Sequence, residues 1–250
     1  MFTDSIELQV FGSELNLGGN RHRVAFSQNA LPRNWDKPGK WVLARQEASQ
    51  LQVRHFDNGQ LVRRCGSGSL ALAAALYLAS AHYYERRVLS DSGSILIGFD
   101  RQGPYYKERP LHQRPTKQHL LWSHLCSEPL QACTFIGSQR EYCLAHLETY
   151  SDINAVRLRA RALTLLSQRA LILLAGSPPS LQMRYFAPQY GITEDSATGS
   201  AAVQVARYFW QHLGSRRLSI LQGTRDSSII YTEINPNRLI TIRGHWHLNP

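Results

Sequence analysis

The stretch from Arg184 to Gln211 reads RYFAPQYGITEDSATGSAAVQVARYFWQ and decides the fold of this chain. It predicts a strand that ends at Phe186, a glycine loop at residues 195–200 and a helix with apolar residues on one face. Backbone N–H groups in the first turn of a helix are unpaired, and together with the positive end of the helix dipole they hold an anion. The stretch therefore predicts a strand, an anion-holding loop and a helix in that order.

A similar unit occurs in the first half of the chain. Residues 53–71 read VRHFDNGQLVRRCGSGSLA and lead into an alanine- and leucine-rich run, which predicts a mostly buried helix with Ser67 or Ser69 as its N-cap. Gly199 follows Gly68 by 131 positions. Two related halves are the simplest interpretation, although a strand, a turn and a helix can also recur by chance.

Runs of alternating apolar and polar residues predict strands elsewhere. They cover residues 6–11, 22–26, 41–45, 51–56 and 94–99 in the first half and residues 132–136 and 142–147 in the second. Residues 154–168 predict a further helix. Residues 102–118 contain three prolines and little apolar periodicity, so the crossing between domains is expected there. The predicted domains are residues 1–115 and 116–250.

The composition predicts a folded protein with an anionic partner. The chain has 250 residues, of which 43% are hydrophobic and 18% charged, so it can bury a sizeable core. Its net charge is +10, and only four of the 28 basic residues are lysines. Arginine holds carboxylates and phosphates with paired hydrogen bonds, which favours a small acid or a nucleic acid. Because Arg157, Arg159 and Arg161 scatter around a predicted helix, nucleic acid is the less expected partner.

The cysteines and the apolar segments exclude several classes. The cysteines at positions 65, 126, 133 and 143 lack zinc-binding spacing, so we expect neither a metal site nor a disulfide scaffold. The start of the chain lacks a basic leader, and the most apolar window, residues 70–81, is far shorter than the roughly 20 residues that span a bilayer. We therefore expect a cytoplasmic protein without a membrane segment.

The two loops predict a site for proton transfer. If they face one another, their N–H groups hold a carboxylate from both sides and stabilise enolate-like charge on the neighbouring carbon. Cys65 heads the first loop, where a helix N-terminus can lower the thiol pKa and make the thiolate available as a base; the alternative is a small buried hydrophobe. Its counterpart in the second loop is Ser196, so a symmetrical thiol pair is absent. Asp195 and Glu194 precede the second helix as candidate acid or base groups, or simply as capping residues.

The stretch from Arg184 to Gln211 closely resembles the second-half signature of the PhzF-like phenazine-biosynthesis family, in which R-x-F-x-P precedes G-I-x-E-D-P-A-T-G-S-A. Gly19-Asn20 with the following VAF resembles the family's G-N-P-x-A-V turn, and the first loop is similar to the C-G-N-G loop of diaminopimelate epimerases. The resemblance covers nearly the whole chain. It implies an α+β fold of two pseudo-symmetric domains, each a curled, barrel-like sheet around a central helix. It also implies a cofactor-independent isomerase or epimerase of a small carboxylic acid, commonly a homodimer.

The resemblance implies roles for particular residues. Asp195 falls on the family's acidic residue, and Cys65 falls on the first catalytic cysteine of the epimerase relatives. The G-N turn and the two loops together supply the expected substrate-binding residues, which are Asn20, Gly66, Ser67, Gly199 and Ser200. The active site is expected in the cleft between the domains.

Two family residues have no counterpart in this sequence. The family's catalytic Glu lies in an S-E-T-x-F segment, and the corresponding region here is compressed and lacks the motif. Glu47 is the nearest candidate, although a solvated hairpin residue is the better interpretation. The family histidine of the first loop, in G-H-x-T, is replaced by Ser67. We expect an isomerase that uses Asp195 and Cys65, and the alternative is a degenerate member that binds a small anionic metabolite without turnover.

Overall fold

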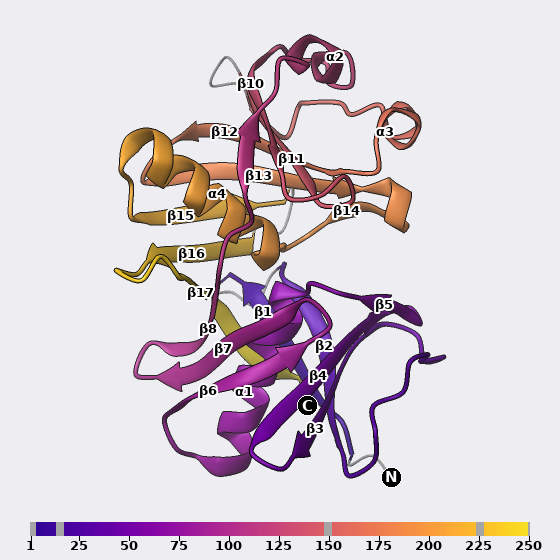
Figure 1. Ribbon diagram of the computed structural model, residues 1–250, viewed down its shortest axis with the longest axis vertical. Helices are drawn as coiled ribbons and strands as arrows, with labels where there is room; N and C mark the ends of the chain where they lie inside the picture. The colour runs from indigo at the N-terminus through magenta and orange to yellow at the C-terminus, as the bar shows by residue number, and fades with distance from the viewer. Residues whose placement is uncertain (1–3, 14–17, 148–151, 224–227, 250) are drawn as a thin grey trace.

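The computed structural model describes residues 4–13, 18–147, 152–223 and 228–249, and its strands form one hydrogen-bonded network of 18 strands. Figure 1 shows two halves, each with strands curled about one long helix. These helices are α1 (Gly66–Ser80) and α4 (Gly199–Leu213). The predicted α+β fold of two similar halves is confirmed. No helix among the described residues is long and apolar enough to cross a membrane.

The first half contains the strands that the alternating sequence runs predicted. Their bounds are β1 Ile6–Gly12, β2 Asn20–Ser27, β3 Lys40–Glu47, β4 Gln50–Asp57, β5 Gln60–Val62, β6 Tyr84–Ser90, β7 Gly93–Asp100 and β8 Gly103–Glu108. Strands β2 and β3 are parallel neighbours, with Arg23 opposite Trp41. The beginning of β3 therefore lies beside the beginning of β2, and the site is built at this end of the two strands.

The second half contains most of the remaining elements. Their bounds are β9 Gln113–Pro115, α2 His119–Ser123, β10 Leu130–Ile136, β11 Tyr142–Leu147, α3 Ala160–Leu166, β12 Ala170–Ser177, β13 Ser180–Ala187, η1 Pro188–Tyr190, β14 Ile192–Asp195, β15 Arg217–Gln222, β16 Ser228–Ile234, β17 Ile240–Arg243 and β18 His245–Asn249. The helix predicted at residues 154–168 forms only over α3. Leu163 is its one fully buried residue, so packing supports only this short segment.

The polypeptide crosses between the two halves at two places. The chain leaves the first half after β8, which pairs with β7, and enters the second at β9, which pairs with β10, within the predicted crossing stretch. The last strands return: β17 pairs with β8, and β18 pairs with β1. Figure 1 shows this return as the yellow strand that runs down beside β1 and β8. The domain boundary at residues 115 and 116 stays a prediction.

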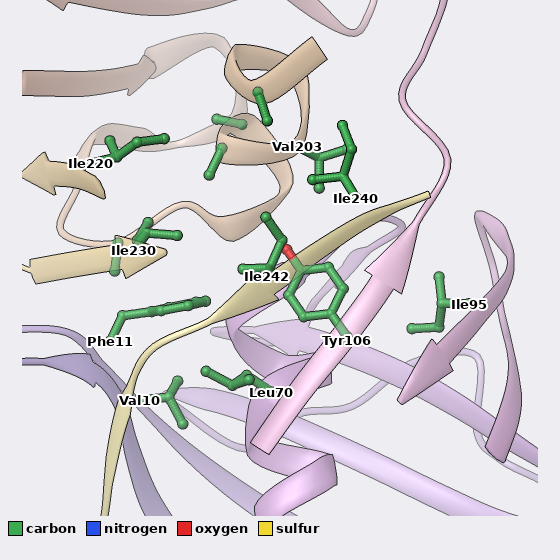
Figure 2. Packing of buried hydrophobic residues seen from close by; sticks show 14 of the residues in the cluster. Val10, Phe11, Leu70, Ile95, Tyr106, Val203, Ile220, Ile230, Ile240 and Ile242 are labelled. Atoms are coloured by element: carbon green, nitrogen blue, oxygen red, sulfur yellow. The ribbon is translucent and has the colours of Figure 1, made fainter. Parts of the chain in front are cut away.

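A single apolar core connects the two central helices. Leu70 of α1 and Val203 of α4 belong to the same cluster of buried residues. Figure 2 shows side chains from β1, β8, β16 and β17 in the space between these helices, among them Phe11, Tyr106 and Ile242. The first ten residues of α1 are buried, which explains why alanine and leucine occupy all sides of this helix.

The N-termini of α1 and α4 meet head to head. A Cβ atom on Gly66 would lie 2.6 Å from the backbone nitrogen of Ser200, and one on Gly199 would lie 2.6 Å from the Tyr106 hydroxyl. Only glycine allows this approach. The N-cap of α1 is Cys65, so the prediction of Ser67 or Ser69 as the cap was wrong, because the helix begins at Gly66.

The contact between the helix N-termini predicts a specific sensitivity at Gly66. We expect Gly66→Ala to lower the free energy of unfolding by about 1–3 kcal/mol, because the backbone of the opposite helix cannot move away from the added methyl group. Urea unfolding of the two proteins would measure this. The control is Ser80→Ala at the exposed other end of α1, for which we expect a change within about 0.5 kcal/mol. Equal effects of the two substitutions would contradict the close contact.

Candidate active site

A small cavity of about 70 Å³ lies where the two helices meet. Both predicted loops line it, and so do side chains from β2, β3 and β14. The first turn of a helix carries N–H groups without intrahelical partners, so two such turns converge on one space. The loop residues in its lining include Cys65, Gly66, Ser67, Thr198, Gly199 and Ser200. The structure therefore brings together the predicted residues of the two loops.

Asp195 ends β14 and projects into this cavity. Its Oδ1 accepts a hydrogen bond from Asn20 Nδ2 at 3.3 Å and lies 3.0 Å from Lys40 Nζ. Its Oδ2 accepts from the Thr198 hydroxyl at 2.7 Å. Gln222 fixes the backbone, because its Nε2 donates to the Asp195 carbonyl at 2.7 Å. The carboxylate is thus held in one orientation by neighbours from several elements.

Lys40 is a site residue that the sequence analysis missed. It begins β3, inside the compressed region where the family resemblance leads one to look for a glutamate, and its Nζ donates to Asn20 Oδ1 at 2.7 Å. Burial lowers the pKa of Lys40, but the charge of Asp195, joined at alkaline pH by that of the Cys65 thiolate, more than offsets this, and the net pKa is raised. One signal was present in the sequence: lysine is rare in this arginine-rich chain, and this lysine directly precedes an apolar strand.

Cys65 is the N-cap residue of α1, and its sulfur accepts a hydrogen bond from the Gly68 N–H at 3.3 Å. Burial raises the pKa of the Cys65 thiol, and the neighbouring Lys40 and the hydrogen bonds to the sulfur lower it only in part. This direction is opposite to the one expected from the helix N-terminus alone, because desolvation of a thiolate outweighs the helix dipole here. At neutral pH Cys65 is therefore a thiol and a proton donor.

Ser67 contacts a histidine that the sequence analysis also missed. Its Oγ lies 2.9 Å from Nε2 of His22, which comes from β2, and 3.7 Å from Cys65 Sγ. Burial lowers the pKa of His22 well below its ordinary value, so the imidazole is neutral. Because β2 ends far from the first loop in sequence, no local motif could have indicated this contact.

Asn20 is a junction between the two halves. Its amide nitrogen donates to the Ala197 carbonyl at 2.6 Å, and its oxygen accepts from the Ser196 hydroxyl at 3.2 Å as well as from Lys40. The side chain is buried, and both its polar atoms have protein partners. Asn20 therefore positions Asp195 and Lys40.

A larger cavity of about 520 Å³ continues from the small one. The two share Asp57, Val62, Arg64, Tyr185 and Ile192 in their walls. The larger cavity lies between the β4–β5 hairpin of the first half and the segment from β13 to β14 of the second. An acid held at the helix N-termini thus has room for further atoms on this side.

Two acidic candidates lie outside the small cavity. Glu47 is at the exposed turn between β3 and β4, where Gln52 donates to its carboxylate. Glu194 forms a two-bond ion pair with Arg184, each bond 2.8 Å long. Within the described residues, no three His, Cys, Asp or Glu side chains form a group that could hold a metal ion.

The ion pair between Lys40 and Asp195 predicts a pH-dependent stability. We expect Lys40→Met to lower the free energy of unfolding at neutral pH by about 1–3 kcal/mol, less than for a fully buried pair because a quarter of the Lys40 side chain is exposed. Since the pKa of Lys40 is raised above 10.5, its contribution is complete below that value and is lost as the pH rises through the raised pKa.

Urea unfolding of both proteins between neutral and strongly alkaline pH would check this, with the difference shrinking above about pH 10.5. The control is Lys37→Met, an exposed lysine nearby, for which we expect a loss below about 1 kcal/mol. A difference that stays constant or grows at alkaline pH would contradict the ion pair.

Comparison with known proteins identifies sequence relatives of this chain. Residues 142–245 match the model of the phenazine biosynthesis-like protein family, PhzC-PhzF. An uncharacterized isomerase of Vibrio cholerae is 27% identical over 195 residues, which make up 77% of this chain and 68% of the relative. The match includes sequence from both halves of the chain, since it is longer than either predicted domain.

Solved structures share the fold. A PhzF-family protein of Enterococcus faecalis has a TM-score of 0.77 at 18% identity, covering 100% of this chain and 98% of its own. A hydroxyproline epimerase of Agrobacterium vitis with bound trans-4-hydroxy-L-proline has a TM-score of 0.63 at 10% identity, covering 100% and 91%. The resemblance expected from the sequence is thereby confirmed: the chain is similar in sequence and in fold to PhzF-like phenazine biosynthesis proteins.

Proposed function

We propose that the protein is a cofactor-independent isomerase that moves a proton on a small carboxylic acid bound between the two loops. The observation that carries the proposal is that Asp195 and the Cys65 thiol line one cavity between two facing helix N-termini. A base and an acid beside an anion-holding site are the groups that proton transfer next to a carboxylate requires.

The electrostatics of the site favour one bound anion. Two helix N-termini with their positive ends together repel one another, and an anion between them removes that repulsion. Lys40 adds a positive charge at the same place, paired with Asp195. The neighbouring imidazoles add none, since burial lowers the pKa of His22 well below its ordinary value and that of His55 to about 4. A carboxylate fits this arrangement.

The two groups take different parts in the reaction. Asp195 accepts a proton from a carbon of the acid, and the charge that develops on the carboxylate is stabilised by the helix N–H groups and by Lys40. Cys65, a thiol at neutral pH, donates its proton to another carbon of the same acid. The double bond then shifts by one position, and the thiolate recovers a proton while Asp195 loses one. Unequal groups suit such a one-way shift.

The substrate is an acid whose carboxylate occupies the small cavity and whose remaining atoms extend into the larger one. The tyrosines of the larger cavity include Tyr142, Tyr185 and Tyr190, which suits a flat, partly apolar body. A homodimer, which the family resemblance implies, and the cytoplasmic location expected from the sequence belong to the same proposal.

A second candidate function is binding of a small acid without turnover. It is favoured by the contacts of Asp195, whose two oxygens already accept hydrogen bonds from Lys40, Asn20 and Thr198. A carboxylate that only holds Lys40, Asn20 and Thr198 in place would make the same contacts. The two candidates differ in whether a carbon-bound proton of the ligand exchanges with solvent.

Deuterium exchange tests the proposed reaction. The protein is incubated in D₂O with unsaturated carboxylic acids and with amino acids, and loss of carbon-bound hydrogen is followed by NMR. We expect exchange with at least one acid, and a decrease of about 100-fold or more in Asp195→Asn and in Cys65→Ala, because each removes one proton-transfer group. The control is Glu47→Gln, which changes an exposed carboxylate outside the cavity and should leave the rate unchanged. An acid that binds but never exchanges would favour the second candidate.

A further inference from the structure

His22 is a buried polar side chain that the proposed reaction does not use. It is 2% exposed and lies on β2, and its Nε2 is 2.9 Å from the hydroxyl oxygen of Ser67. Its other ring nitrogen, Nδ1, is buried and has no hydrogen-bond partner within the described part of the chain. A buried nitrogen without a hydrogen-bond partner is unusual in a protein and requires an explanation. The unpartnered Nδ1 fixes which way the hydrogen bonds run from His22 through Ser67 to Cys65.

The neighbours of Ser67 determine which way its hydrogen bonds run. Within the described residues, three atoms lie within hydrogen-bonding distance of the Ser67 hydroxyl oxygen: His22 Nε2, Asn20 Nδ2 at 3.5 Å and Cys65 Sγ at 3.7 Å. The Asn20 nitrogen is a donor, because its oxygen faces the Lys40 ammonium, which can only donate. If His22 also donates, the sulfur of Cys65 is the acceptor that remains for the Ser67 hydroxyl hydrogen.

The burial of Nδ1 decides which ring nitrogen of His22 carries the proton. A neutral imidazole has one N–H and one lone pair. An N–H buried without an acceptor is costlier and rarer than an acceptor without a donor. The proton is therefore on Nε2, which has a partner, and Nε2–H donates to Ser67.

We propose that His22 is a positioning residue for Cys65: its Nε2–H donates to Ser67, which turns the Ser67 hydroxyl hydrogen toward the sulfur. The sulfur then has two donors, the Ser67 hydroxyl and the Gly68 N–H. Both stabilise the thiolate that remains after Cys65 has given its proton away. His22 itself neither gains nor loses a proton. The inference deepens the proposed function, on which its catalytic meaning rests.

Other ionisable groups also face Cys65, and the variants below leave them unchanged. Lys40 lowers the pKa of the thiol and Asp195 raises it. His55, Tyr106 and Tyr142 also lie near the sulfur and are neutral at physiological pH. Arg64 is charged but forms an ion pair with Glu108. A change at His22 that moves the Cys65 titration therefore acts through Ser67 or through packing, and the experiment separates these two.

The test reads the thiol itself and needs no substrate, so it is independent of the exchange experiment. The rate of Cys65 alkylation by iodoacetamide is measured against pH, with mass spectrometry resolving the four cysteines. Burial raises the pKa of Cys126 to about 12, and Cys133 and Cys143 are buried; because mass spectrometry reads each cysteine separately, any reaction at these three does not affect the Cys65 rate. We expect Ser67→Ala to move the midpoint upward by about one pH unit, a tenfold slower reaction at neutral pH.

The sign of the shift at His22 discriminates between the two directions of the hydrogen bond. We expect His22→Leu, which keeps the volume and removes the donor, to raise the midpoint by about half a pH unit. If Nε2 instead accepted from Ser67, the same substitution would free the hydroxyl for the sulfur and lower the midpoint. His22→Gln is the matched control, because its terminal amide can donate from a similar position, and it should stay near the wild-type midpoint.

Two further outcomes decide the proposal. In the Ser67→Ala background, His22→Leu should produce no additional shift, because its effect passes through that hydroxyl. In the wild-type protein, the ¹⁵N shifts of His22 should show the Nε2–H tautomer, a result that requires no variant to fold. The proposal would be overturned by any of three results. These are a lowered or unchanged Cys65 midpoint in His22→Leu, an undiminished effect of His22→Leu in the Ser67→Ala background, or an Nδ1–H tautomer of His22.

Discussion

The structure depends on the contact between the N-termini of α1 and α4. Gly66 and Gly199 allow the two helix ends to approach so closely that a Cβ atom on either glycine would lie less than 3.0 Å from the Tyr106 hydroxyl. This contact is electrostatically unfavourable by itself, because the positive ends of two dipoles face one another. The apolar core that continues from Leu70 to Val203 holds them together in spite of it. The fold thus maintains a small cavity beside two positive helix ends, which is where we propose that an anion binds.

The charged groups around this space follow from that constraint. Asp195 supplies a negative charge from the second half, and Lys40 balances it from the first. Asn20 and Thr198 orient the carboxylate, and Gln222 fixes the backbone behind it. The family resemblance led us to look for a glutamate in the region that here contains Lys40. A lysine in this region gives the cavity a permanent cation, which sets this chain apart from the pattern expected from the resemblance.

Much of the fold could be predicted from local sequence patterns. The alternation of apolar and polar residues predicted most strands of the first half, and the two glycine loops predicted where the central helices begin. Both signals are contained within a few neighbouring residues. Asp195 and Cys65 could be placed in the site for the same reason. Lys40 and His22 could not, since they approach the loops only through the parallel pairing of β2 and β3. The direction of the Cys65 pKa was missed because burial depends on the whole fold.

The central claim is that the two facing helix ends form one anion site. It is tested most directly by titrating the ¹⁵N-labelled protein with benzoate and following the backbone amide signals. The account predicts saturable shifts in Gly66 and Ser67 of the first loop and in Gly199 and Ser200 of the second, all with the same dissociation constant. Shifts confined to one loop, or a different constant for each loop, would contradict it.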